Sequence, residues 1–179
     1  MRTGWQRNWV RTVTTLMTAA VMVMIFLFSM ENAEKSDKRS GVISQTVVEV
    51  IHPEYADLKP EQQKHIFDSV QHVVRKCAHF TEYMILGFMI RLCLESWIGH
   101  RMKKSRWLVL IGFGAGAAYA CSDEIHQLAI DGRSGQMKDV FVDCAGVLAG
   151  VAIGTVVVNL VNRRNAENVL MGKNTDPGE

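Results

Sequence analysis

The sequence has few of the features that mark a disulfide-stapled, metal-binding or nucleic-acid-binding protein. Its 179 residues include four cysteines without C-x-x-C spacing, each in or beside an apolar segment, so we interpret them as small buried residues and not as disulfide partners. No H-E-x-x-H motif is present. A net charge of +2 leaves no basic surface large enough to neutralise a row of phosphates, which excludes a nucleic-acid binder.

Charged residues are also missing from three long stretches of the chain. Residues 12–30, 107–122 and 144–162 contain no Asp, Glu, Lys or Arg. Each stretch is about as long as a helix that crosses a bilayer. A half-buried helix of a soluble protein hides only one apolar stripe, so runs of this length exclude a soluble single domain.

The hydrophobic pattern predicts an all-α polytopic membrane protein with four transmembrane helices, at about residues 10–30, 75–97, 107–126 and 139–161. The second span is the least apolar. The first could instead be a signal peptide, but its apolar run is longer than a signal core and Ser29 to Ala33 form a poor cleavage site. We therefore interpret it as an uncleaved anchor.

Basic residues predict how the spans are oriented. Three arginines precede or open the first span, and two of them lie in the tail at 1–9. The loop between spans two and three has basic residues and no acidic ones, and the tail at 162–179 opens with Arg163 and Arg164. Because basic short loops stay inside, we expect a cell-membrane protein with both termini cytoplasmic. The segment 31–74 and the short loop 127–138 then lie outside. The polar tail from residue 165 is predicted to be disordered.

The long outer segment carries two amphipathic patterns. Val42, Ile43, Val47, Val48 and Ile51 recur at helical spacing before Pro53, and a second pattern follows Pro60 up to Val74. Such helices would lie on the membrane surface or cap the bundle. A mobile tether is the alternative.

Intramembrane polar residues gather at one end of three spans. Lys76, His79 and Tyr83 form one stripe at i, i+3 and i+7, while Asp123 and Gln127, like Asp139 and Asp143, are four apart. Charged groups near hydrocarbon are costly unless they find partners or water, so we expect one hydrated cluster at the outer face. The candidate ligand-binding residues are Lys76, His79, Tyr83, Asp123, Glu124, Gln127, Arg133, Asp139 and Asp143.

Two further patterns predict helix contacts. Gly146, Gly150 and Gly154 repeat every four residues, as do Gly112, Gly116 and Ala120, which favours close packing of transmembrane backbones. Arg91 and Glu95 are four apart near the inner end of span two. We interpret them as a local pair in which Arg91 reaches the interface.

Two segments resemble the signatures of VanZ-like membrane proteins. The first runs from Lys76-Cys77-Ala78-His79-Phe80 to Leu86-Gly87, and the second comprises Ser122 to Gln127, Gly132-Arg133-Ser134-Gly135, Asp139 and Gly146. Together they cover about residues 75–155, which would form a three-helix VanZ-like core within 75–161. Many members carry Asn where this chain has Asp143. The resemblance implies a bacterial envelope protein, and the namesake is associated with low-level teicoplanin resistance.

Three interpretations of the polar cluster follow. In the first, it binds an anionic lipid, a lipid-linked wall precursor or a glycopeptide, so that the bilayer and such amphiphiles are the partners. In the second, the chain is a membrane enzyme, a hydrolase or transferase acting on a phosphorylated lipid, with His79, Glu82, Asp123, Glu124 and Asp139 as candidate catalytic residues. Its metal signal, which would add His126, is weak, and we assign no metal or cofactor. In the third, the cluster only orders the helices.

Overall fold

The chain folds into helices joined by short connections. The computed structural model describes residues 4–31, 33–99, 102, 105–130 and 137–174, and this part of the chain contains no strand. Its helices are α1 (Gly4–Ser29), α2 (Ala33–Ile51), α3 (Pro60–Leu94), α4 (Ser105–Gln127) and α5 (Met137–Asn174). A 3₁₀ turn, η1 (Tyr55–Asp57), joins α2 to α3, and a π-helical turn, η2 (Glu95–Gly99), follows α3. The predicted all-α fold class is confirmed.

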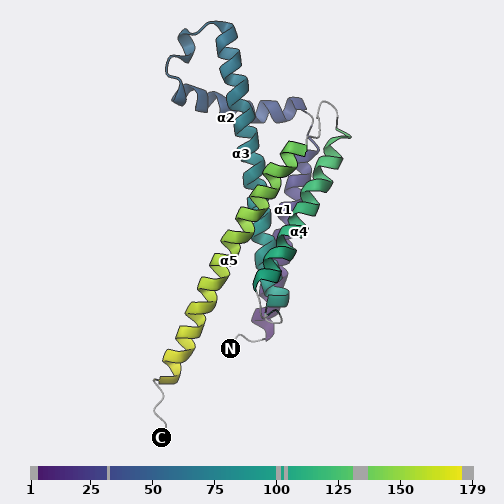
Figure 1. The fold of residues 1–179 in the computed structure, drawn as a ribbon, viewed down its shortest axis with the longest axis vertical. Helices are drawn as coiled ribbons and strands as arrows, with labels where there is room; N and C mark the ends of the chain where they lie inside the picture. Colours follow the sequence, from purple (N-terminus) through teal and green to yellow (C-terminus); the bar gives the residue numbers. More distant parts are fainter. Residues whose placement is uncertain (1–3, 32, 100–101, 103–104, 131–136, 175–179) are drawn as a thin grey trace.

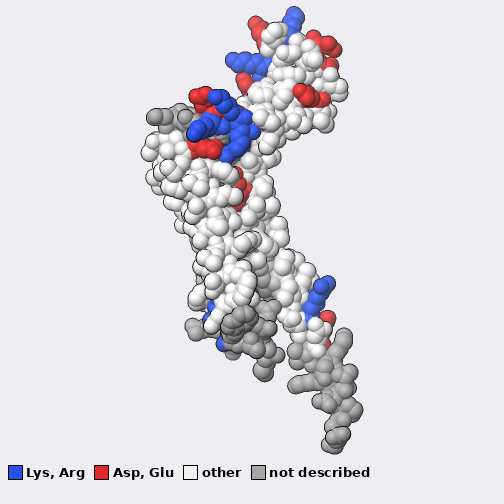
Figure 2. All heavy atoms as spheres, turned by 180° about the vertical axis from the view of Figure 1, so that it is seen from behind, with Lys and Arg blue, Asp and Glu red and all other residues white. Residues whose placement is uncertain are grey.

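Four of these helices are long and apolar enough to cross a membrane. The spans are Arg7–Ser29, Pro60–Gly99, Arg106–Gln127 and Lys138–Asn168. They form the bundle of Figure 1, and α2 runs crosswise at one end of it, which we call the α2 end. Figure 2 shows a broad belt almost without charged side chains between this end and the other. The four predicted spans are confirmed, and the chain is a multi-pass membrane protein.

The segment between the first two spans is helical, as one of the two alternatives predicted. α3 begins with Pro60 at its first position, where a missing N–H costs nothing, and the Gln62 side chain accepts a hydrogen bond from the Lys59 N–H at 3.3 Å. The helix then continues past the predicted boundary at residues 74 and 75 without a break. At 35 residues it is about 50 Å long, well beyond the ~30 Å hydrocarbon core, so its first turns project from the bundle.

Two expectations are wrong in detail. The tail from residue 165 was expected to be disordered, but α5 continues to Asn174 because helix formers follow Arg164 and the first proline is Pro177. The cysteines are all free, but Cys77 and Cys121 are exposed and not buried. A cysteine on the outside of a transmembrane helix can face lipid as well as protein, so an apolar sequence context does not settle its burial.

Glycines let α3 and α5 approach closely, as their spacing predicted. A Cβ on Gly146 would collide with the Phe80 carbonyl oxygen, and one on Gly150 with the Met84 carbonyl oxygen. From the opposite side, Gly87 of α3 meets the backbone of Val147. Gly116 and Ala120 bring α4 to the same region, where the buried core is Ile25, Tyr83, Leu86, Ala120, Val147 and Val151.

Candidate functional site

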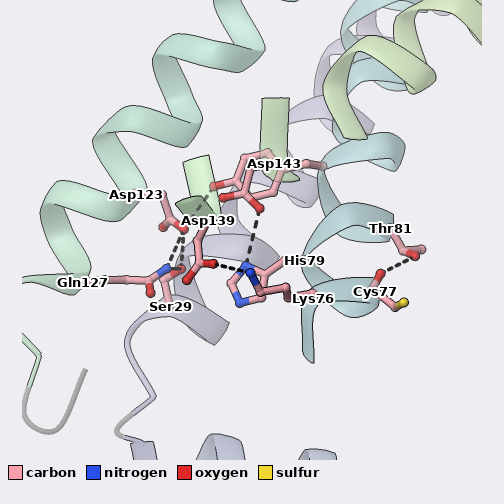
Figure 3. A network of polar contacts seen from close by, with 10 residues as sticks. Ser29, Lys76, Cys77, His79, Thr81, Asp123, Gln127, Asp139 and Asp143 are labelled. Carbon is pink, nitrogen blue, oxygen red and sulfur yellow. Dashed lines mark hydrogen bonds and ion pairs between the residues drawn. The ribbon is translucent and has the colours of Figure 1, made fainter. Parts of the chain in front are cut away.

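The predicted polar stripes of α3, α4 and α5 converge at the α2 end of the bundle. Figure 3 shows side chains of α3 and α5 facing one another, with those of α4 beside them. Asp143 is fully buried, and Asp123, Glu124 and Gln127 are nearly so. Arg133 belongs to residues 131–136 and lies outside the described residues, so its predicted place in the cluster stays a prediction.

Asp123 of α4 is the centre of a buried hydrogen-bond network. One carboxylate oxygen accepts hydrogen bonds from Ser29 Oγ at 2.7 Å, Tyr83 Oη at 3.0 Å and Gln127 Nε2 at 3.0 Å. Gln127 Nε2 also donates to Ser29 Oγ at 3.3 Å. Bonds to a charged acceptor are the stronger ones, so this network ties α1 and α3 to α4.

Ser29 is a member of the network that the sequence analysis missed. It is the last residue of α1 and is 3% exposed. The available signal was a hydroxyl at the end of an apolar run, placed at the same membrane face as the predicted cluster. That signal is weak, because a serine at the end of a span usually meets water.

An ion pair and a histidine–carboxylate contact connect α3 to α5 in successive turns. Lys76 Nζ lies 3.5 Å from Asp139 Oδ1, and His79 Nδ1 lies 3.7 Å from Asp143 Oδ1. The outer pair is about one-third exposed on both sides, whereas the inner pair joins a His79 side chain that is 22% exposed to an Asp143 side chain that is 0% exposed. The four residues therefore meet, as their helical spacing predicted. His79 connects the buried Asp143 carboxylate to the surface.

A pocket of about 170 Å³ opens beside His79, between α2 and the outer turns of α3. Its polar lining includes Arg39 and Ser40 of α2 and Arg75, His79 and Glu82 of α3, and its apolar lining includes Phe28, Ile43, Val74 and Ala78. Figure 2 shows Lys and Arg side chains gathered with acidic ones at this end, directly above the uncharged belt. The pocket therefore lies at the border between the charged α2 end and the uncharged belt.

Both pocket arginines are held by weak, half-exposed pairs. Arg39 Nη1 lies 3.1 Å from Glu31 Oε2, and its guanidinium stacks over the Phe28 ring at 4.2 Å. Arg75 Nη2 lies 3.2 Å from Asp37 Oδ1. The sequence analysis named neither arginine as a site residue. Arg75 is next to the predicted residue Lys76, whereas Arg39 is far from the second span in sequence and only the fold brings α2 over it.

The described residues contain no group of three His, Cys, Asp or Glu side chains that could hold a metal ion. His126, which the enzyme interpretation would add as a ligand, stacks on Phe26 of α1 with ring centroids 4.9 Å apart. Glu82 borders the pocket, while Glu124 is 7% exposed in the bundle. The carboxylates predicted as one catalytic set are thus divided: Glu82 borders the pocket, Asp139 pairs with Lys76, and Asp123 and Glu124 are buried in the bundle.

A second polar cluster lies toward the opposite end of the bundle. Arg91 pairs with Glu95 at 3.0 Å, as predicted, but its side chain is 1% exposed and does not reach the interface. Its Nε donates instead to Thr155 Oγ1 of α5 at 3.1 Å. The Arg91 stem packs where Gly154 leaves room, so the guanidinium finds a partner within the bundle and need not extend to water.

Comparison with known proteins gives one match. Neither the curated proteins nor the solved structures yielded a similar chain. The model of the VanZ/LLP1 family matches residues 14–158, which is most of the chain and includes all four spans in whole or in part. The paired polar residues of α3 and α5 and the glycine seam between them all lie within this match. The chain is therefore a membrane protein of the VanZ/LLP1 family.

Proposed function

We propose that this protein is a non-enzymatic envelope protein that binds the anionic head group of an amphiphile on the outer face of the cell membrane. The observation that carries the proposal is the pocket between α2 and α3, where Arg39 and Arg75 line a cavity of about 170 Å³. Guanidinium groups bind phosphate and carboxylate through two parallel hydrogen bonds. The apolar part of the lining suits the first methylenes or an aromatic part of such a ligand.

The carboxylate partners of these arginines favour exchange with a ligand. The side chains of Arg39 and Arg75 are 44% and 42% exposed, and exposed ion pairs contribute only about 0–1 kcal/mol each. An incoming phosphate would compete with Glu31 and Asp37 for the two guanidinium groups. The Asp123 network, by contrast, is saturated with protein donors on one oxygen and serves to hold the helices in place.

The first test is binding of anionic amphiphiles to protein in nanodiscs of phosphatidylcholine. Short-chain phosphatidylglycerol, a pyrophosphate-linked wall precursor and a glycopeptide are titrated separately, which distinguishes the three sources of an anionic group. Arg75→Gln should weaken binding of the true ligand about ten- to hundredfold, because a charge-assisted hydrogen bond contributes ~1.5–3 kcal/mol.

The matched control is Lys64→Gln, which removes the same charge from an exposed position on α3 away from the pocket. It should bind like the wild type, apart from any general effect of net charge. Equal binding by Arg75→Gln and wild type for all three probes would overturn the proposal.

We extend the proposal to glycopeptide resistance. In a deletion strain, the wild-type gene should raise the minimal inhibitory concentration of teicoplanin-type antibiotics, and Arg75→Gln and Arg133→Ala should not, at equal membrane abundance. Lys64→Gln should protect like the wild type. Full protection by both arginine variants would contradict a role for this polar face in resistance.

A second candidate function, a membrane enzyme acting on a phosphorylated lipid, rests on the pairing of His79 with Asp143. A histidine that borders a pocket and has a buried carboxylate behind it is arranged as a general base. If the chain releases phosphate from such lipids, His79→Gln should abolish release while leaving head-group binding measurable. Absence of phosphate release by the wild type would reject this candidate and leave the binding proposal intact.

A further inference from the structure

α2 has an apolar side that no described part of the chain covers. Val50 is 75% exposed and Ile43 is 56% exposed, and because they are seven residues apart they lie on one side of the helix. Ser44 and Val48, which are fully buried, lie on the side that packs in the hairpin with α3. A water-soluble helix would not place its large aliphatic side chains opposite its own packing partner without reason.

Contacts within the pocket fix the direction in which this side faces. Arg39 and Ile43, one turn apart, line the pocket together with Phe28 of α1, and Arg39 stacks on that ring. Phe28 lies in the last turn of the first span, so the Arg39–Ile43–Val50 side faces the membrane-spanning bundle and the lipid around it. Figure 1 shows α2 crosswise at this end, extending beyond the bundle on one side.

Two polar residues of α2, Gln45 and Glu49, face away from the side that carries Ile43 and Val50. Gln45 and Glu49, also one turn apart, line a shallow cavity with Tyr55 of η1 and Gln63 of α3. The first turns of α3 project beyond the bundle in Figure 1, so Gln45 and Glu49 face away from the membrane. Neighbouring residues such as Glu49 and Val50 thus point to water and to lipid respectively.

We propose that α2 is an in-plane helix that lies in the head-group region of the leaflet at the α2 end, with Ile43 and Val50 in its acyl boundary. The basic residues of α2, Lys35, Lys38 and Arg39, are matched by Glu34, Asp37 and Glu49, so the helix has no net charge. Its apolar side is therefore the feature that places it at the interface, as in other amphipathic helices that lie in the membrane plane. The uncharged belt of the spans begins directly below the charged residues of the α2 end, so a helix lying crosswise there is at the level where the belt ends.

This placement also specifies how the pocket is reached. Ile43 belongs both to the apolar side of α2 and to the pocket lining, so the pocket opens toward the leaflet. The ligand is then a lipid or lipid-anchored molecule that enters laterally, with its anionic group at Arg39 and Arg75 and its chains beside Ile43. This last step rests on the proposed function, whereas the position of α2 does not.

The test is the depth of spin labels on α2 in bilayers that contain phosphatidylglycerol. In a full-length background with the four native cysteines changed to alanine, single cysteines replace Val50 or Glu49, and each is labelled with a nitroxide. Oxygen concentrates in lipid and a nickel chelate stays in water. The Val50→Cys label should collide several-fold more with oxygen than with the chelate, and the Glu49→Cys label should show the reverse.

The pair Ile43→Cys and Gln45→Cys repeats the comparison one to two turns earlier in α2. Of the four labelled positions, only Ile43 lines the pocket between α2 and α3. The comparison of Val50 with Glu49 therefore stands even if a label at Ile43 disturbs that pocket. Equal exposure to the chelate at residues 49 and 50 would overturn the in-plane position of α2. The nanodisc titration of Arg75→Gln is independent of this result, so either proposal can fail alone.

Discussion

At the scale of single residues, the polar cluster has two kinds of members. Asp123 has its donors within the bundle, at 2.7–3.0 Å, and its side chain is nearly inaccessible. Lys76, Arg39 and Arg75 have partners whose side chains are 29–48% exposed. We expect residues of the first kind to matter for folding, and the proposed function assigns ligand binding to residues of the second kind.

The tyrosine at the centre of the network gives a test of this distinction. Tyr83→Phe removes a bond to a charged carboxylate and should lower stability by about 1.5–3 kcal/mol, measured as thermal unfolding in detergent. Tyr119→Phe is the control, because its hydroxyl donates at 2.6 Å to the Met22 carbonyl, a neutral acceptor already within a helix, and should cost about 1 kcal/mol. A Tyr83→Phe variant as stable as Tyr119→Phe would show that the Asp123 network does not hold the helices.

The sequence predicts this site only where its residues share a helix. Lys76 with His79, and Asp139 with Asp143, follow from helical spacing, and the need to neutralise buried charge predicts that the two stripes meet. Ser29 and Arg39 come from other helices, and no spacing rule connects them to α3. Their places depend on how α1 ends and how α2 turns back, which are tertiary properties.

At the scale of helices, three of the four spans follow from charge-free runs and the second from a weaker apolar pattern, whereas the helices at the α2 end do not have clear limits in the sequence. The first turns of α3 are amphipathic and its later turns are apolar. This change of pattern at residues 74 and 75 suggests that one helix ends there and another begins, but the backbone is a single helix across it. No proline or glycine stands at that point to end the helix, so it continues. The glycine seams are predictable because lipid gives no other advantage to small residues repeated every four positions.

Glycine substitutions test the packing of α3 against α5. Gly150→Ala places a methyl group against the Met84 carbonyl oxygen, a backbone atom that is unable to rotate away, so the two helices must separate. We expect a loss of about 1–3 kcal/mol or more, seen as a lower unfolding temperature in detergent. Gly114→Ala has nothing within 4 Å of the added carbon and should be neutral or slightly stabilising. Similar losses for both variants would mean that the seam is not the tight contact described.

At the scale of the whole molecule, charge is sorted between two ends separated by the apolar belt. Residues 31–74 hold eight acidic and five basic residues, whereas the opposite end carries the arginines that precede the first span and those that follow the last. Because four spans return the chain to its starting side, α1 begins and α5 ends at the same end of the bundle. The net charge of +2 is the sum of a mixed end and a basic end.

This sorting predicts the orientation in the membrane, with the basic end in the cytoplasm. In the cysteine-free background, Glu54→Cys beside η1 and Glu167→Cys near the end of α5 place one exposed thiol at each end. A membrane-impermeant maleimide added to intact cells should label residue 54 at once and residue 167 only after lysis. The reverse pattern would put the arginine pocket at the cytoplasmic leaflet, where it could still bind anionic lipid but would not meet a glycopeptide. Orientation therefore decides between the ligands that the pocket chemistry alone leaves equivalent.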